Sequence, residues 1–262
     1  MKKLIFVLSV MLLVGPAVGR ADEVALPGVT FDTTFVSKYI WHGFNYYGND
    51  NSAIQPSVDI DFWGSGFGAM VFHSRANRSG FRNLEEFDYI LYYGNSILDD
   101  TTWAMDYNVS WLYYDYYDNK SSDTDLQELV LSFAWPNLLG GGLVPSYSTG
   151  KLWPTSSNVP AMKDVGGWVH VFGLGYDLET PAIFPGSDKQ VFSLMADLTY
   201  NDGYGLATAD HDWSHVTLGV STGFDITPNL TFTPAVYYQI SMDDSVNKND
   251  EVWTALSLTY SF

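Results

Sequence analysis

Alternation of apolar and polar side chains, repeated in one segment after another, is the feature that most restricts how this chain can fold. From Ile54 to Phe62 every second residue is apolar or proline, and the residues between them are polar. The same period of two runs through residues 103–113 and 252–262. Because successive side chains of a β-strand point to opposite faces, each such segment predicts a strand with one apolar face and one small or polar face.

About twelve segments carry this pattern, which predicts an all-β chain. They cover residues 29–43, 53–63, 67–75, 85–94, 102–114, 126–135, 143–152, 167–176, 190–200, 213–224, 230–241 and 251–262. Tight turns, expected at Trp63–Gly66 and Asp225–Asn229, alternate with longer loops. The longer, polar loops are expected at Asn45–Asn51, Ala76–Leu84, Asp115–Asp125, Trp153–Gly166, Asn201–Asp212 and Met242–Asp250. This alternation is typical of a transmembrane antiparallel up-and-down β-barrel with both termini in the periplasm.

One connection does not fit the alternation of short turns and long loops. Asp177–Lys189 falls on the side of the short turns but is long and contains two prolines. Either a strand boundary is misplaced there or that turn is extended.

The beginning of the chain predicts export. Lys2 and Lys3 precede an apolar run from Leu4 to Val14, and small residues follow at Gly19 and Ala21. This pattern predicts a signal peptide over residues 1–21 and a barrel over residues 22–262. The alternative, a membrane-anchoring helix, is disfavoured because the run is shorter than the roughly 20 residues that a spanning helix needs.

The end of the chain predicts the membrane. Tyr260-Ser261-Phe262 ends an alternating segment on an aromatic residue, as closing strands of bacterial outer-membrane barrels do. A barrel of about twelve strands in the bacterial outer membrane is therefore expected, closed by pairing of the last strand with the first, since open sheet edges do not occur in lipid. Its expected partners are outer-membrane lipid, lipopolysaccharide and, through Phe262, the barrel-assembly machinery. The alternative is a soluble β-protein that happens to end in Phe.

Composition excludes several classes of function. The chain has 30 acidic and 12 basic residues, a net charge of -18, which does not suit binding to nucleic-acid phosphates. It has no cysteine, so disulfides and thiolate chemistry are excluded. No cofactor is expected.

Aromatic residues make up 16% of the chain, and we expect girdles of aromatic side chains at both membrane interfaces. The expected girdle residues are Tyr39 and Trp41 at an outer strand end, and Trp63, Tyr260 and Phe262 at inner ends.

The first third of the chain carries a recognisable order of motifs. Residues 36–43 read Val-Ser-Lys-Tyr-Ile-Trp-His-Gly, and they are followed by Gln55-Pro56-Ser57 and Glu86-Phe87-Asp88. Over residues 30–95 this order resembles the TorF-like porin family, in which an S-x-Y-x-x-R-G strand precedes a Q-P-S strand and an E-x-D strand. The resemblance implies a porin-like channel. His42 stands where that family usually has Arg, so a lumen charge there would be weaker and pH-dependent.

Acidic residues dominate the face predicted to line the lumen. They are Asp32, Asp59, Asp61, Glu86, Asp88, Asp106, Glu128 and Asp197, and the inward cationic candidates are Lys38 and His42. Because carboxylates attract cations, we predict that these ten residues line a channel for passive diffusion of small cationic or neutral solutes. The alternative role, compatible with the first, is a structural network in which Lys38 and His42 balance Glu86 and Asp88 near the outer rim.

A closed or ligand-binding barrel is the main rival to the channel. It would be indicated if Ile40, Tyr92, Leu112 and Tyr114 filled the interior. An outer-membrane hydrolase is less favoured, because the adjacent His73 and Ser74 should point to opposite faces of a strand and cannot act together. We therefore predict no catalytic residues.

Metal binding is the last alternative. The loop acids Asp115, Asp118, Asp123 and Asp125 lack the spacing of a calcium loop and are more simply read as solvated. His211 and His215 have a spacing that binds zinc on a helix but not in a strand. No metal site is predicted.

Overall fold

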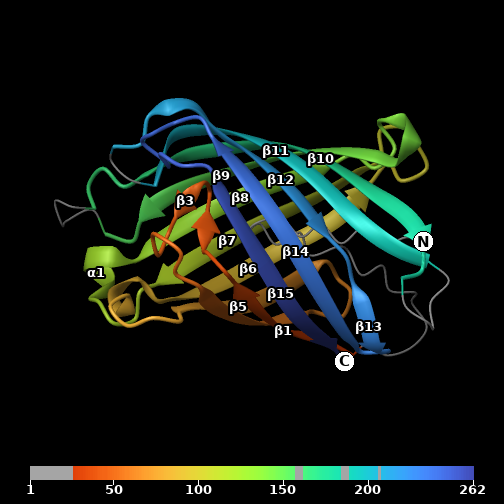
Figure 1. Ribbon diagram of the computed structural model, residues 1–262, viewed down its shortest axis with the longest axis horizontal. Helices are drawn as coiled ribbons and strands as arrows, with labels where there is room; N and C mark the ends of the chain where they lie inside the picture. Colours follow the sequence, from red (N-terminus) through yellow and green to blue (C-terminus); the bar gives the residue numbers. More distant parts are fainter. Residues whose placement is uncertain (1–25, 157–161, 184–188, 206–207) are drawn as a thin grey trace.

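The chain folds into one closed β-sheet (Figure 1). The computed structural model describes residues 26–156, 162–183, 189–205 and 208–262, so the predicted signal peptide lies outside the described residues. Its long strands are β1 (Gly28–Val36), β4 (Ala53–Asp61), β5 (Phe67–Ala76), β6 (Glu86–Ile97), β7 (Met105–Asp115), β8 (Leu126–Ala134), β9 (Leu143–Pro154), β10 (Gly166–Pro181), β11 (Lys189–Gly205), β12 (His211–Ser221), β14 (Leu230–Ser241) and β15 (Glu251–Ser261). The short elements are β2 (Ile40–Trp41), β3 (Phe44–Asn45), β13 (Phe224–Thr227), α1 (Ser121–Thr124) and the 3₁₀ turns η1 (Arg82–Leu84) and η2 (Gly140–Gly142). None of the helices in these ranges is long and apolar enough to cross a bilayer.

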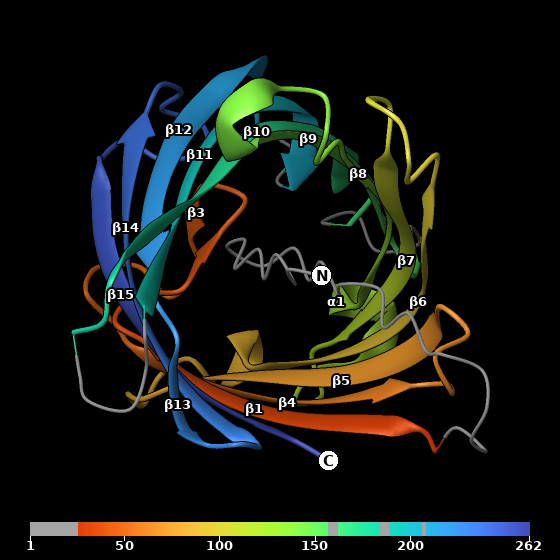
Figure 2. The same cartoon turned by 90° about the vertical axis from the view of Figure 1, so that its right-hand side faces the viewer.

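Antiparallel pairing closes the sheet into a ring of twelve long strands, as predicted. Each long strand pairs with its neighbours in sequence, and β1 pairs with β15 through a register that includes Phe31 opposite Tyr260. Figure 2 shows the ring along its axis. The closing strand therefore has the predicted partner, and the long strands leave no unpaired edge.

The two faces of the sheet differ as the alternation predicts. In β15, Val252 and Leu258 are about half exposed on the outside, whereas Trp253 and Ala255 between them are buried inside. The outer face is apolar along every side of the ring, and the inner face carries most of the polar and acidic side chains.

The two ends of the barrel carry different connections. We call the end where β1 begins and β15 finishes the terminal end, and the opposite end the loop end. At the terminal end a tight turn joins β4 to β5, with Trp63 and Gly64 in the left-handed region (φ 59° and 65°). The connection expected at Asp177–Lys189 is reduced to residues 182–188, because β10 runs on to Pro181 and β11 begins at Lys189. The misplaced strand boundary was therefore the correct alternative.

The first predicted strand, residues 29–43, is too long. β1 ends at Val36, and residues 37–52, which we call loop 1, turn into the barrel (Figure 2). Within loop 1, β2 and β3 form a hairpin whose two turn residues, His42 and Gly43, both have positive φ (47° and 92°). Positive φ at both positions is the signature of the tight turn that suits a two-residue hairpin.

The inward course of loop 1 also corrects the predicted outer girdle. Tyr39 and Trp41 lie inside the barrel, 2% and 7% exposed, and not at the membrane interface. Trp63 and Phe262, by contrast, are exposed at the terminal end, where they were expected.

Candidate functional site

Loop 1 lies inside the lumen near the loop end, where its side chains contact the barrel wall. Its Trp41 ring lies 5.9 Å from the ring of Tyr114 on β7 and 5.2 Å from the ring of Tyr204 on β11. Tyr46 of loop 1 donates a hydrogen bond to the hydroxyl of Tyr116 (2.8 Å). These rings belong to one buried cluster that joins loop 1 to the walls. Loop 1 therefore spans the lumen and narrows it.

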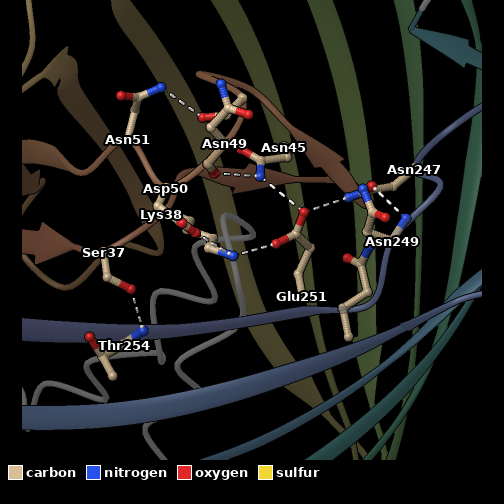
Figure 3. A network of polar contacts seen from close by, with 12 residues as sticks. Ser37, Lys38, Asn45, Asn49, Asp50, Asn51, Asn247, Asn249, Glu251 and Thr254 are labelled. Carbon is tan, nitrogen blue, oxygen red and sulfur yellow. Dashed lines mark hydrogen bonds and ion pairs between the residues drawn. The ribbon is translucent and has the colours of Figure 1, made fainter.

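A polar network fastens the other side of loop 1 to β15 (Figure 3). The buried carboxylate of Glu251 accepts hydrogen bonds from Lys38 Nζ (2.7 Å), Asn45 Nδ2 (3.0 Å) and Asn247 Nδ2 (3.3 Å). Lys38 also forms an ion pair with the exposed Asp50 (3.0 Å). The hydrogen bond to Glu251 raises the pKa of Lys38 above its usual value, so this lysine stays charged. We call Lys38, Asn45, Asn247 and Glu251 the latch.

The tip of the hairpin is seated against β12 and β14. The carbonyl oxygen of Gly43 accepts hydrogen bonds from Gln239 Nε2 (3.0 Å) and Asn247 Nδ2 (3.2 Å). A Cβ atom at Gly43 would lie 2.5 Å from Nδ1 of His215, so no other residue fits this seat without a shift. His215 itself is held by Ser214 Oγ (2.7 Å).

His42, beside Gly43 at the hairpin tip, is an uncharged group. Burial, and secondarily the nearby His215, lower its pKa to about 3. Its Nε2 lies 3.9 Å from Glu128 Oε1, too far for a hydrogen bond. The predicted pH-dependent lumen charge is therefore absent at neutral pH.

Buried acids lie on the wall of the barrel opposite the latch, on the other side of loop 1. Glu86 accepts a hydrogen bond from Tyr39 Oη (2.9 Å), and Glu128 accepts one from Tyr114 Oη (2.5 Å). Asp88 is buried two residues after Glu86 on β6, and its Oδ1 has no hydrogen-bond partner among the described residues. The predicted balance of Lys38 and His42 against Glu86 and Asp88 is wrong, because loop 1 carries Lys38 to Glu251 instead.

Four further predicted acids lie in the half of the lumen nearer the terminal end. Asp32 accepts hydrogen bonds from Thr34 and Thr259, Asp59 from Tyr92, Asp61 from the amide of Gly64, and Asp106 from Ser96. Among the described residues, their partners are hydroxyl and amide groups. Within the described ranges, no Lys, Arg or His lies within ion-pair distance of these four carboxylates.

The sequence prediction named Lys38 but missed its latch partners Asn45, Asn247 and Glu251. Extending the alternation of β15 back by two residues, from Trp253 to Glu251, would have put Glu251 on the inner face. Nothing local indicated that Asn45 and Asn247 would meet it, because that depends on loop 1 turning inward. Asp197, the eighth predicted acid, lies on the inner face of β11 without a hydrogen bond or ion pair in the described part of the chain.

The residues considered for catalysis do not form a working pair. His73 stacks on Phe87 (ring centroids 4.3 Å apart), whereas Ser74 is fully buried on the inner face beside Tyr47. A bulge in β12 does bring Ser214 and His215 together, but no carboxylate hydrogen-bonds that histidine within the described ranges.

Two of the loop acids considered for metal binding have other partners. Asp118 binds Arg82, which lowers the pKa of that carboxyl, and Asp125 accepts a hydrogen bond from Tyr113. Across the described ranges, no three metal-binding side chains gather in one place.

Known proteins resemble this chain in fold but not in sequence. No family model and no curated protein matches it. The structure of the NanC porin matches with a TM-score of 0.52 at 12% identity, over 88% of this chain and 98% of that chain. The KdgM porin, solved in complex with disordered oligogalacturonate, matches with a TM-score of 0.48 at 9% identity, over 90% and 99%. OccK5 of Pseudomonas aeruginosa matches at 0.39 and 12% identity, over 87% and 62%. The likeness to NanC shows the fold: the chain is a closed, twelve-stranded antiparallel β-barrel of the bacterial outer-membrane porin type.

Proposed function

We propose that this barrel is an outer-membrane channel for passive diffusion of small cationic or neutral solutes. The observation that carries the proposal is the set of inward carboxylates at Asp32, Asp59, Asp61 and Asp106, which have no cationic partner among the described residues. Fixed charges of one sign in a narrow, low-dielectric passage concentrate ions of the opposite sign. The described loop 1 cations do not oppose this field, since Lys38 is paired and His42 is neutral.

Reversal potentials in a planar bilayer test this selectivity. Under a salt gradient we expect the purified protein to pass cations in preference to anions. The double variant Asp59→Asn with Asp61→Asn should reduce the preference by about two- to fivefold, because it removes two of the fixed charges. The matched variant Asp212→Asn with Asp250→Asn removes two exposed carboxylates at the loop end and should leave it unchanged. Anion preference in the wild type would contradict the proposal.

A barrel held shut by loop 1 is the second candidate, and a specific observation favours it. Of the four residues whose inward packing would indicate closure, Ile40, Tyr92 and Tyr114 are buried and Leu112 is half-buried against them. The two candidates are connected, because release of loop 1 would turn a closed barrel into an open one. The resemblance to TorF-like porins, the signal peptide, and lipid, lipopolysaccharide and assembly-machinery partners stay predictions.

A further inference from the structure

A small cavity lies between the tip of the loop 1 hairpin and the inner faces of β10, β11, β12, β14 and β15. Its volume is about 30 Å³, room for one or two water-sized groups. Its polar lining consists of His42, Asp197, Thr199, His215, Thr217 and Gln239. Ile40, Val171 and the ring of Trp253 form the apolar wall.

Two side chains bordering this cavity have acceptor oxygens without a partner among the described residues. Gln239 is fully buried; its Nε2 donates to Gly43, but its Oε1 has no hydrogen-bond partner in the described part of the chain. Asp197 is 9% exposed and forms no hydrogen bond or ion pair there. Leaving the buried oxygen of Gln239 unpaired costs about 1–3 kcal/mol. Both are acceptors, so the missing group is a donor.

The walls indicate what kind of donor fits. No Lys or Arg lines the cavity, so no basic side chain would repel a bound cation there. Ca²⁺ and Mg²⁺ require six or more oxygen ligands, whereas here oxygen is offered by four side chains and the rest of the wall is largely apolar. An ammonium group needs only a few acceptors, and the ring of Trp253, which stacks on Tyr237 (5.2 Å), can face its charge.

We propose that this cavity binds the ammonium group of a small primary amine, with Asp197 and Gln239 as its acceptors and Trp253 as its aromatic wall. The inference deepens the proposed function and rests on it, since the amine reaches the cavity through the lumen. It names one class of cationic solute that the channel would hold on its way.

Thermal unfolding of the full barrel in detergent, followed by circular dichroism, tests this site. Methylammonium chloride should raise the Tm in a saturable way. Tetramethylammonium chloride at the same ionic strength should not, because it is too large for the cavity and has no N–H donor. Asp197→Asn should raise the apparent Kd for methylammonium by about tenfold or more, because it removes the charged acceptor. Asp225→Asn, which removes an exposed carboxylate from β13, should leave that Kd unchanged.

The outcomes distinguish failure of the proposed ammonium site from failure of the proposed channel function. Equal stabilisation by methylammonium, tetramethylammonium and potassium would overturn the ammonium site, and so would no stabilisation at all. These comparisons use the wild-type protein, so they decide the question even if Asp197→Asn does not fold. A channel that selects cations in bilayers but fails this test keeps the proposed function and loses only the site.

Discussion

Replacing Gly43 by alanine is expected to raise the single-channel conductance several-fold. The new Cβ atom would lie 2.5 Å from His215 Nδ1 and 2.9 Å from Val246 Cγ1, and Gly43 has a φ of +92°, which other residues rarely adopt. Strain of this backbone kind costs about 1–3 kcal/mol, and the collision adds to it. His215 is fixed by Ser214, so we expect the hairpin tip rather than the wall to move. Loop 1 would then leave its seat and widen the passage.

Gly48 provides a matched control for this variant. It also lies in loop 1 with a positive φ (+61°), but a Cβ atom there would meet nothing within 4 Å. Gly48→Ala therefore imposes backbone strain without a collision, and its conductance in planar bilayers should stay close to that of the wild type. If the two variants conduct equally, the seat of the hairpin tip does not limit the passage.

The strands could be predicted from sequence because each is specified by its own residues. Alternation identified all twelve long strands, since the period of two is carried by the residues of each strand alone. The ends were less certain where alternation fades, as between β10 and β11. There the strands extend as far as Pro181 and back to Lys189.

Loop 1 could not be predicted, because its residues continue the same period of two. Tyr39 and Trp41 share one parity with Phe35, while Lys38 and His42 share the other with Asp32, as in a membrane strand. The backbone at His42 and Gly43 reverses the chain. His-Gly is not among the usual dipeptides of such turns, which favour Asn-Gly and Asp-Gly. The wrong partners predicted for Lys38 and His42 followed from that error, since a loop inside the lumen contacts different walls from a strand within the sheet.

Replacing Glu251 by alanine should release loop 1 more completely than any other single change in the latch. Glu251 is 5% exposed and accepts hydrogen bonds from Lys38, Asn45 and Asn247. Removing the carboxylate deletes all three of these hydrogen bonds, and a hydrogen bond to a charged group contributes about 1.5–3 kcal/mol. We expect bilayer recordings of Glu251→Ala to show large, frequent conductance steps. We also expect a protease that cleaves after lysine to cut the purified protein at Lys38 in loop 1.

Replacing Asp50 distinguishes the loss of the latch from the mere loss of a negative charge beside Lys38. It binds the same Lys38 Nζ at 3.0 Å, but its side chain is 89% exposed, so the pair contributes at most about 1 kcal/mol. Asp50→Asn should therefore conduct as the wild type does. The double variant Lys38→Met with Glu251→Gln removes both charges of the Lys38–Glu251 pair and keeps an acceptor oxygen for Asn45 and Asn247, so it should recover part of the closed state. If Asp50→Asn matched Glu251→Ala, loop 1 would be held by the field of its surroundings and not by the latch.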